Sequence, residues 1–259
     1  RVVREVVVRL IKDNSFGLVL FSWKKDDKFL SIVDSQTFLD CFDSGTCTKS
    51  KILFVSKISI DALSHGDIFF DIDAVWNTGT HNRAEVYSLL KKIGVKILVY
   101  VHDIIPISHP EFAHENTLFN FMNRYLVPIF SYADMIITST ESVLNQVNSL
   151  RKKIGLPEME GRVSWLGADF KAEKKAQEKI SPTAIEIAKK GKYILIVGTI
   201  EPRKNHALLL DAYDQKLSAL GINLVFAGRQ GWNVEPLMGF TIWKVRTTPQ
   251  SNTSIKTRL

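Results

Sequence analysis

The sequence predicts an α/β protein with parallel sheets, because short apolar runs alternate with segments of helical periodicity. The clearest example lies between Lys192 and Tyr213, where the β-branched run Tyr193–Val197 ends at Gly198 and leads through a basic turn into a helix. Such a run is typical of a buried parallel strand. The turn, Thr199 to Asn205, therefore lies between the carboxyl end of a strand and the amino end of a helix. In open α/β sheets ligands bind there, and nearby Arg and Lys favour a phosphate.

The amino-terminal part is predicted to hold one helix and three strands. Val2 to Lys12 is amphipathic, with valines on one side and charged residues on the other. Gly17 to Trp23 and Phe29 to Val33 have the composition of strands, whereas Thr37 to Lys57 is predicted to be loop-rich. Asp67 to Asp73 is a further strand of the buried type, and we interpret its Asp-Ile-Asp end as structural rather than as a metal motif.

A helix and a central strand follow. Asn82 to Ile93 has helical periodicity, and Gly94 ends the helix as a C-cap residue would. The inner stripe of this helix is predicted to be Val86, Leu89, Leu90 and Ile93. The apolar run that begins at Lys96 predicts a central strand with His102 and Asp103 at its carboxyl end. In isolation, a histidine after a strand more often packs or forms a hydrogen bond than takes part in catalysis.

The next segments repeat the alternation of helix and strand. Asn116 to Ser131 is predicted to be a helix rich in Phe and Leu. Ala133 to Thr140 is predicted to be a strand that leads into a helix ending near Lys153. Ser139 stands at the end of this strand, where Ser and Thr usually serve as helix caps. Arg162 to Phe170 is predicted to be a strand followed by a glycine turn.

The remaining segments suggest where the domains divide. Asn223 to Gly228 is predicted to be the next parallel strand, and Arg229 begins the turn after it. Lys171 to Pro182 is charged and without strong periodicity, which is typical of a crossover between domains. Gly239 to Leu259 lacks a hydrophobic period, so we expect poor order there. The predicted boundaries are an amino-terminal domain over 1–170, a linker over 171–184, a partial second domain over 185–238 and a tail over 239–259.

Composition and charge narrow the class of protein. With 259 residues and 45% hydrophobic content, the chain can bury a sizeable core. Neither a membrane-spanning run nor a signal peptide is visible, and Cys41 and Cys47 are interpreted as free thiols of a cytoplasmic protein. The net charge of +7 indicates an anionic partner, but four of the basic residues lie in the tail without an acidic neighbour. We therefore expect no nucleic-acid groove.

Four motifs resemble segments of one enzyme family. They are Glu201-Pro-Arg-Lys-Asn-His206, Val99-Tyr-Val-His-Asp103, Ala133-Asp-Met-Ile-Ile-Thr-Ser-Thr140 and Gly228-Arg-Gln-Gly-Trp232. These motifs resemble those of the retaining glycosyltransferases of family 4, which have the two-domain GT-B fold. The resemblance implies two Rossmann-like domains with parallel sheets. The first would lie on the acceptor side, and the second, incomplete here, would bind a nucleotide-sugar.

The resemblance also implies roles for single residues. Lys204, assisted by Arg203, would bind the diphosphate of the donor, and His102 would lie beside the transferred sugar as the catalytic residue. The residues implied to face the cleft are Asp103, Ser139, Glu201 and Arg229. No metal ion or other cofactor is expected, because basic residues would neutralise the departing diphosphate. Thr199 stands where some members of the family carry an arginine, so one familiar phosphate contact is absent or supplied by another group.

The implied partners are a donor and an acceptor. The donor would be a nucleotide-sugar, with GDP-mannose as the leading candidate, and it would be a substrate rather than a cofactor. The acceptor would be a growing cell-surface polysaccharide, such as O-antigen or capsule, or a lipid-linked saccharide. The resemblance therefore suggests a cytoplasmic protein, with peripheral contact at the inner face of the plasma membrane as a further option.

Departures from the family pattern leave other functions open. The family's first strand and glycine-rich turn do not precede Arg1, and its E-x7-E segment does not follow Leu237, so we expect a chain truncated at both ends. An alternative is a catalytically inactive remnant, or a non-catalytic nucleotide-binding or interaction module. A nicotinamide-dependent dehydrogenase is disfavoured because no G-x-G-x-x-G motif follows a strand. DNA binding is disfavoured because no basic recognition helix is visible.

Overall fold

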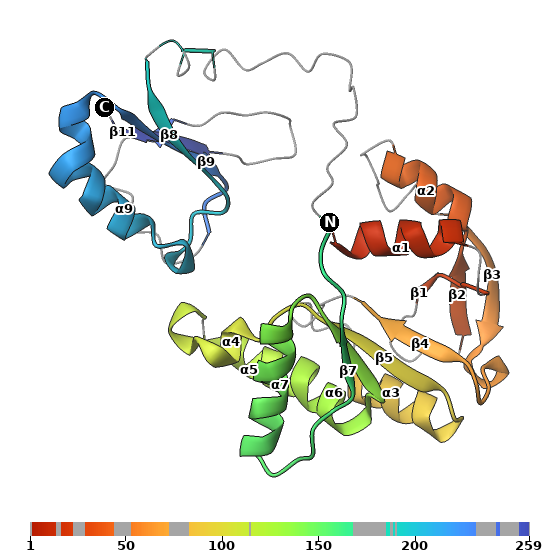
Figure 1. The fold of residues 1–259 in the computed structure, drawn as a ribbon. Coiled ribbons are helices and arrows are strands. Elements are labelled where there is room, and N and C mark those ends of the chain that lie inside the picture. Colours follow the sequence, from red (N-terminus) through yellow and green to blue (C-terminus); the bar gives the residue numbers. More distant parts are fainter. Residues whose placement is uncertain are drawn as a thin grey trace. The chain divides into compact units, whose positions relative to one another are not determined.

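The computed structural model of the chain (Figure 1) has two compact units, Arg1–Ala168 and Asp169–Leu259. Each unit has its own sheets and its own apolar core. The predicted α/β class is confirmed, since helices alternate with parallel strands in both units. The structure describes residues 2–13, 17–22, 29–43, 53–72, 83–113, 115–167, 185–186, 189, 191–231, 242–243 and 254–258. The predicted linker, 171–184, and Cys47 lie outside these residues.

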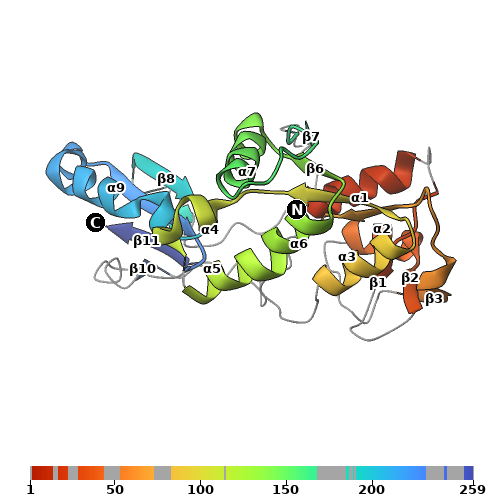
Figure 2. The ribbon, with the colours of Figure 1, turned by 90° about the horizontal axis from the view of Figure 1, so that it is seen from below.

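The main sheet of the first unit has four parallel strands in the order β4-β5-β6-β7. The strands are β4 (Ile68–Asp71), β5 (Lys96–Val101), β6 (Met135–Thr138) and β7 (Gly161–Val163). Their helical connections are α3 (Arg83–Lys92), α4 (Ile105–Ser108), α5 (Glu115–Phe121), α6 (Val127–Tyr132) and α7 (Glu141–Lys153). A π-helical turn, Met122–Leu126, joins α5 to α6. This is the Rossmann-like alternation that the sequence predicts, and Figure 2 shows the helices alongside the strands.

The core of this unit lies between the sheet and its helices. Val99 and Val101 on β5 and Ile136 on β6 are fully buried against apolar side chains of the helices. Burying a side chain of this size contributes about 1.5 to 3 kcal/mol. Gly94 ends α3 with φ +81°, a left-handed conformation that suits glycine, so the predicted C-cap is confirmed. Thr140, the residue after Ser139, caps α7, because its hydroxyl accepts a hydrogen bond from the Val143 N–H.

The amino-terminal part differs from the prediction in one segment. The strands β1 (Phe21–Ser22) and β2 (Phe29–Val33) lie within the segments predicted to form them, and the helix α1 (Val2–Asp13) ends one residue after its predicted end. The prediction of loops over Thr37–Lys57 is wrong, since α2 (Ser35–Asp43) and β3 (Phe54–Ser59) lie there. The carboxylate of Asp34 accepts hydrogen bonds from the N–H and hydroxyl of Thr37, which fixes the first turn of α2. β1, β2 and β3 form an antiparallel sheet.

The second unit has a sheet in the order β10-β11-β9-β8. The parallel pair β8 (Tyr193–Val197) and β9 (Asn223–Gly228) is connected through α9 (His206–Ala212), a π-helical turn Tyr213–Leu217 and a 3-10 turn Ser218–Leu220. The tail contributes β10 (Ile242–Trp243) and β11 (Ser254–Arg258), and β11 pairs with β9 in antiparallel orientation. The structure thus has two strands within the segment 239–259, for which the sequence predicts poor order.

One face of β8 is open to solvent. The run Tyr193–Val197 was predicted to be a buried parallel strand, but its burial alternates along the strand. Ile194 and Ile196 pack against the core of the unit, whereas Leu195 and Val197 are 49% and 76% exposed. The prediction of a buried strand is therefore wrong for one of its faces. The pattern of alternate burial is that of a strand covered on one face only.

Two backbone segments of the second unit lie in direct contact. Gly198, which follows β8 with φ +150°, and Gly228, which ends β9, lie so close that a β-carbon on Gly228 would overlap the carbonyl oxygen of Gly198. The Gly198 N–H also donates to the carbonyl of Ala227 at 2.9 Å. A glycine is therefore required at position 228 for the turns after the two strands to meet.

We predict that Gly228→Ala destabilises the second unit by about 3 kcal/mol or more, because the rigid backbone of Gly198 cannot move away from the added carbon. Hydrogen exchange of peptides that cover β8 and β9 should increase strongly. Gly167→Ala is a matched control in the first unit, because open space surrounds Gly167. Exchange in β8 and β9 that stays as slow as in the wild type would contradict the prediction.

A second prediction concerns acid stability of the first unit. Partial burial alone would raise the pKa of Asp134, but hydrogen bonds from the Lys91 ammonium and the Ile97 N–H lower the pKa below its ordinary value. The stabilisation is complete above the pKa that Asp134 has in the unfolded chain. It is lost as the pH falls through the lower pKa that Asp134 has in the folded chain. Urea midpoints of Asp134→Asn should therefore approach those of the wild type on acidification. If the difference between the two urea midpoints stays constant as the pH falls, the ionised Asp134 carboxylate does not contribute this stability.

Candidate functional site

Two of the predicted site residues lie together at the carboxyl edge of the four-stranded sheet. His102 directly follows β5 and Ser139 directly follows β6, and these parallel strands pair Val101 with Thr138. The Ser139 hydroxyl donates to the carbonyl oxygen of His102 at 3.4 Å. The structure therefore brings His102 and Ser139 into contact through the His102 backbone.

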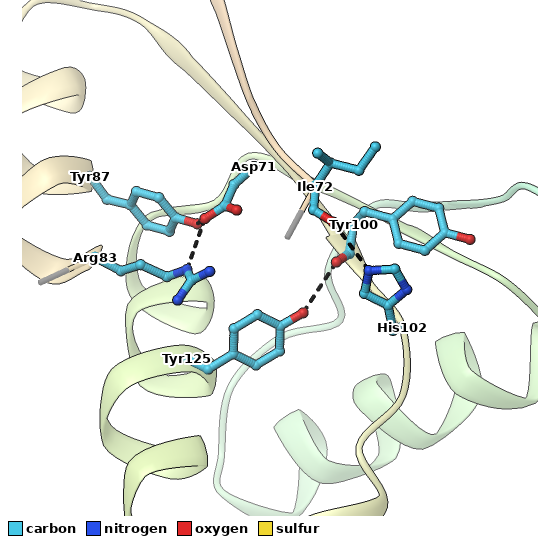
Figure 3. Close-up of polar contacts among 7 residues, drawn as sticks. All are labelled: Asp71, Ile72, Arg83, Tyr87, Tyr100, His102 and Tyr125. Atoms are coloured by element: carbon cyan, nitrogen blue, oxygen red, sulfur yellow. Dashed lines mark hydrogen bonds and ion pairs between the residues drawn. The ribbon is translucent and has the colours of Figure 1, made fainter. Parts of the chain in front are cut away.

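The His102 ring is held on two sides (Figure 3). Its Nε2 atom lies 3.1 Å from the carbonyl oxygen of Ile72, the residue that follows β4. A carbonyl oxygen can only accept, so Nε2 carries a proton and donates it. In the neutral ring, Nδ1 then has a free lone pair. The ring of Tyr100 lies beside the imidazole, with 4.7 Å between the ring centroids.

Asp103 has a local structural partner. One of its carboxylate oxygens accepts a hydrogen bond from the Ile105 N–H at 3.0 Å, where α4 begins. A side-chain oxygen that binds the N–H two residues later stabilises the turn into a helix. Asp103 thus lies next to His102 at the sheet edge, but one oxygen of its carboxylate is engaged by the backbone of its own loop.

A buried charged cluster lies at the end of β4 (Figure 3). One oxygen of Asp71 accepts hydrogen bonds from Arg83 Nε at 2.8 Å and from the Tyr87 hydroxyl at 2.6 Å. The side chains of Arg83 and Asp71 are only 7% and 13% exposed. The guanidinium also lies over the ring of Tyr125, 5.1 Å from its centroid. The structural interpretation of Asp71 agrees with these contacts, whereas the sequence patterns single out neither Arg83 nor Tyr87.

The cluster changes the ionisation of its members. Burial would lower the pKa of Arg83, but the charge of Asp71 more than offsets it, so the pKa is raised. Burial, followed by the nearby Asp71 charge, raises the pKa of Tyr87. Arg83 therefore stays charged and Tyr87 stays protonated, which preserves both hydrogen bonds to Asp71.

In the second unit, the basic turn follows β8. Glu201 is buried, with 3% of its side chain exposed, and its Oε1 lies 2.7 Å from Nη2 of Arg203. The angles of this ion pair fall short of a hydrogen bond, so Oε1 has no hydrogen-bond donor among the described residues. Arg203 is 37% exposed. The Lys204 side chain is exposed, and the described residues provide no salt-bridge partner for its ammonium.

Backbone hydrogen bonds join this turn to the one after β9. The Ile200 N–H donates to the carbonyl of Arg229, and the Gly231 N–H donates to the carbonyl of Ile200, both at 2.8 Å. The Arg229 side chain is exposed. His206 is buried, and its Nδ1 lies 3.3 Å from the carbonyl of Glu201. Glu201, Arg203, Lys204 and Arg229 therefore share the carboxyl edge of the β8–β9 pair.

Comparisons with known proteins give a partial match. The chain is 30% identical over 176 residues to the "Serotype-specific mannosyltransferase WbdA" of Escherichia coli, and a second protein of the same name and organism matches at 30% over 177 residues. Each match covers 63% of this chain and 20% of the relative, so the chain spans about a fifth of the length of the curated relatives it matches. No protein-family model matches, and neither does any solved structure.

Metal-ligand clusters and membrane-spanning helices are both absent from the described residues. Within that part of the chain, no group of three or more His, Cys, Asp or Glu side chains is arranged to hold a metal ion. The same residues include no helix with the length and apolar character needed to span a bilayer.

We predict that Arg83→Met destabilises the first unit by about 3 to 5 kcal/mol, because the buried Asp71 carboxylate would lose its counter-charge. Chemical denaturation measures the loss of unfolding free energy, and hydrogen exchange in β4 and β5 shows where the structure is weakened. Arg162→Met is the matched control, because the Arg162 side chain is 75% exposed and its ion pair with Glu160 spans 3.9 Å. An exposed pair of this kind contributes about 0 to 1 kcal/mol. Equal losses of stability in the two variants would show that Arg83 is not an essential counter-charge of Asp71.

Proposed function

We propose that the chain is part of a glycosyltransferase that transfers a sugar from a nucleotide-sugar to a saccharide or lipid-linked acceptor. The observation that carries the proposal is the similarity to mannosyltransferases over 63% of the chain. The positions of the predicted residues at the carboxyl ends of parallel strands support it, because ligands of α/β proteins bind at such edges. Mannose is the candidate sugar, with GDP-mannose as the candidate donor.

Lys204 and Arg203 are the proposed binding residues for the donor diphosphate. Lys204 is the stronger candidate, because its exposed ammonium has no partner among the described residues. Arg203 is oriented by the buried carboxylate of Glu201, and about a third of its side chain stays open to solvent. Two cations on one turn would stabilise the negative charge that develops on a departing diphosphate, so the proposed reaction requires no metal ion. Arg229, on the neighbouring turn, could add a third cation.

His102 is the proposed residue beside the transferred sugar. Its Nε2 is engaged by the Ile72 carbonyl, so Nδ1 is the nitrogen that remains for a ligand. Ser139 supports the His102 backbone from the adjacent strand, and Asp103 shapes the loop that follows. Retention of configuration, the two-domain GT-B arrangement and action at the inner face of the plasma membrane are further parts of the proposal.

The proposal predicts that Lys204→Ala weakens GDP binding about tenfold or more, because a charge-assisted hydrogen bond contributes about 1.5 to 3 kcal/mol. Isothermal titration calorimetry measures the affinity. Lys192→Ala is the matched control, since Lys192 is also exposed but precedes β8 at its opposite end.

Two outcomes would count against this function. If GDP, UDP, TDP and ADP and their sugars leave the melting temperature of the wild-type chain unchanged in excess ligand, the binding proposal fails. If Lys192→Ala weakens binding as much as Lys204→Ala, the basic turn is not the diphosphate site. Transfer of radiolabelled mannose from GDP-mannose to a lipid-linked acceptor tests the enzyme activity separately.

A further inference from the structure

We infer that the buried cluster of Asp71, Arg83 and Tyr87 positions the His102 ring and selects its tautomer. The inference rests on the proposed function, in which His102 lies beside the sugar. The physical link is short, because Asp71 is the last residue of β4 and Ile72, the next residue, has the carbonyl that accepts the Nε2 proton. Figure 3 shows the cluster and the imidazole on either side of this strand end.

The strand end needs this support because β4 lies at the edge of the described four-stranded sheet. Its only strand partner there is β5, and the ladder between them ends with Asp71 opposite Val99. Ile72 lies one residue beyond that last pair. The two hydrogen bonds that Asp71 accepts from α3 therefore restrain the backbone next to Ile72. Without them, the ladder with β5 is the remaining restraint on the Ile72 carbonyl among the described residues of the sheet.

The other side of the His102 contact is fixed independently. The Tyr125 hydroxyl donates to the carbonyl oxygen of Tyr100 at 3.1 Å, and the Ser139 hydroxyl donates to that of His102. The backbone on both sides of Val101 is thus tied to α5–α6 and to β6. With this side held, the position of the Ile72 carbonyl decides whether Nε2 keeps its proton and its hydrogen bond.

The tautomer determines which chemical group His102 can meet. With the proton on Nε2, the neutral ring presents the lone pair of Nδ1, which accepts a hydrogen bond. A sugar hydroxyl can donate to this lone pair, whereas a fully ionised phosphate oxygen has no proton to give. The positioned ring therefore fits the hydroxyl part of a sugar nucleotide rather than its diphosphate. In the proposed reaction the buried cluster contacts no reacting atom. Its members, Asp71, Arg83 and Tyr87, are therefore positioning residues.

Tyr87→Phe is the variant that tests the inference, because it removes the 2.6 Å hydrogen bond to Asp71 while keeping the ring and every charge. Tyr213→Phe is the matched control, a buried tyrosine of the second unit. The readout is the long-range proton–nitrogen NMR spectrum of the histidine rings in the ligand-free chain, with His102 assigned by its loss in His102→Gln. The spectrum reports which ring nitrogen is protonated and how fast its proton exchanges.

The wild type should show His102 protonated on Nε2 with a slowly exchanging proton. Tyr87→Phe should speed this exchange about fivefold, the population ratio that one net hydrogen bond supports, and Tyr213→Phe should leave it unchanged. A wild-type proton on Nδ1, or a Tyr87→Phe spectrum identical to that of the wild type, would overturn the inference. If Tyr87→Phe does not fold, the wild-type spectrum decides by the site and exchange of the proton.

These outcomes are separable from those of the proposed function, because the spectrum requires no nucleotide-sugar. A protected Nε2 proton in a chain that binds no nucleotide would leave the positioning contact in place and remove the sugar transfer. If the chain binds nucleotide and transfers sugar while His102 is protonated on Nδ1, the proposed function stands and the positioning contact is excluded.

Discussion

A buried charge that must be neutralised is the constraint on which the first unit depends. Arg83 and Asp71 lie out of solvent, and an unmatched ion there would cost several kcal/mol, so α3 and β4 can pack only where guanidinium and carboxylate meet. Such a pair adds little net stability compared with apolar side chains, but it tolerates little displacement. Tyr87 narrows the geometry further, because its hydroxyl must reach the same carboxylate oxygen. The pair therefore fixes where β4 ends, and with it the Ile72 carbonyl.

In the second unit, a contact between backbones fixes the strand ends. This contact depends on the absence of side chains at two glycines. Gly198 and Gly228 let the backbones after β8 and β9 touch, and hydrogen bonds between Ile200 and the turn after β9 continue that contact. Backbone contacts of this kind leave the adjacent side chains free to serve other purposes. The basic residues of the turn after β8 are thereby presented on a rigid support.

Local patterns predicted the regular elements of the fold well, because periodicity and capping act over a few residues. The strand before His102, the α7 helix and the end of α3 at Gly94 are examples. The buried cluster was not predicted, since Arg83, Tyr87 and Leu90 share one face of α3 but an arginine is normally counted as a surface residue. Its counter-charge comes from β4, beyond the reach of any pattern within one helix. The one-sided exposure of β8 likewise depends on what covers the sheet.

Local sequence patterns also do not show how the surroundings of two neighbouring residues with the same charge differ. Arg203 and Lys204 are neighbouring cations of the same turn, but their surroundings differ. The buried Glu201 carboxylate holds Arg203 at 2.7 Å, so an incoming anion would compete with an existing ion pair. Lys204 has no such pair among the described residues, and an anion would meet its charge without that competition. Glu201 in turn needs Arg203, because a buried carboxylate without a counter-charge destabilises the fold. Arg203 thus also maintains the turn, whereas Lys204 is available to a ligand without that competition.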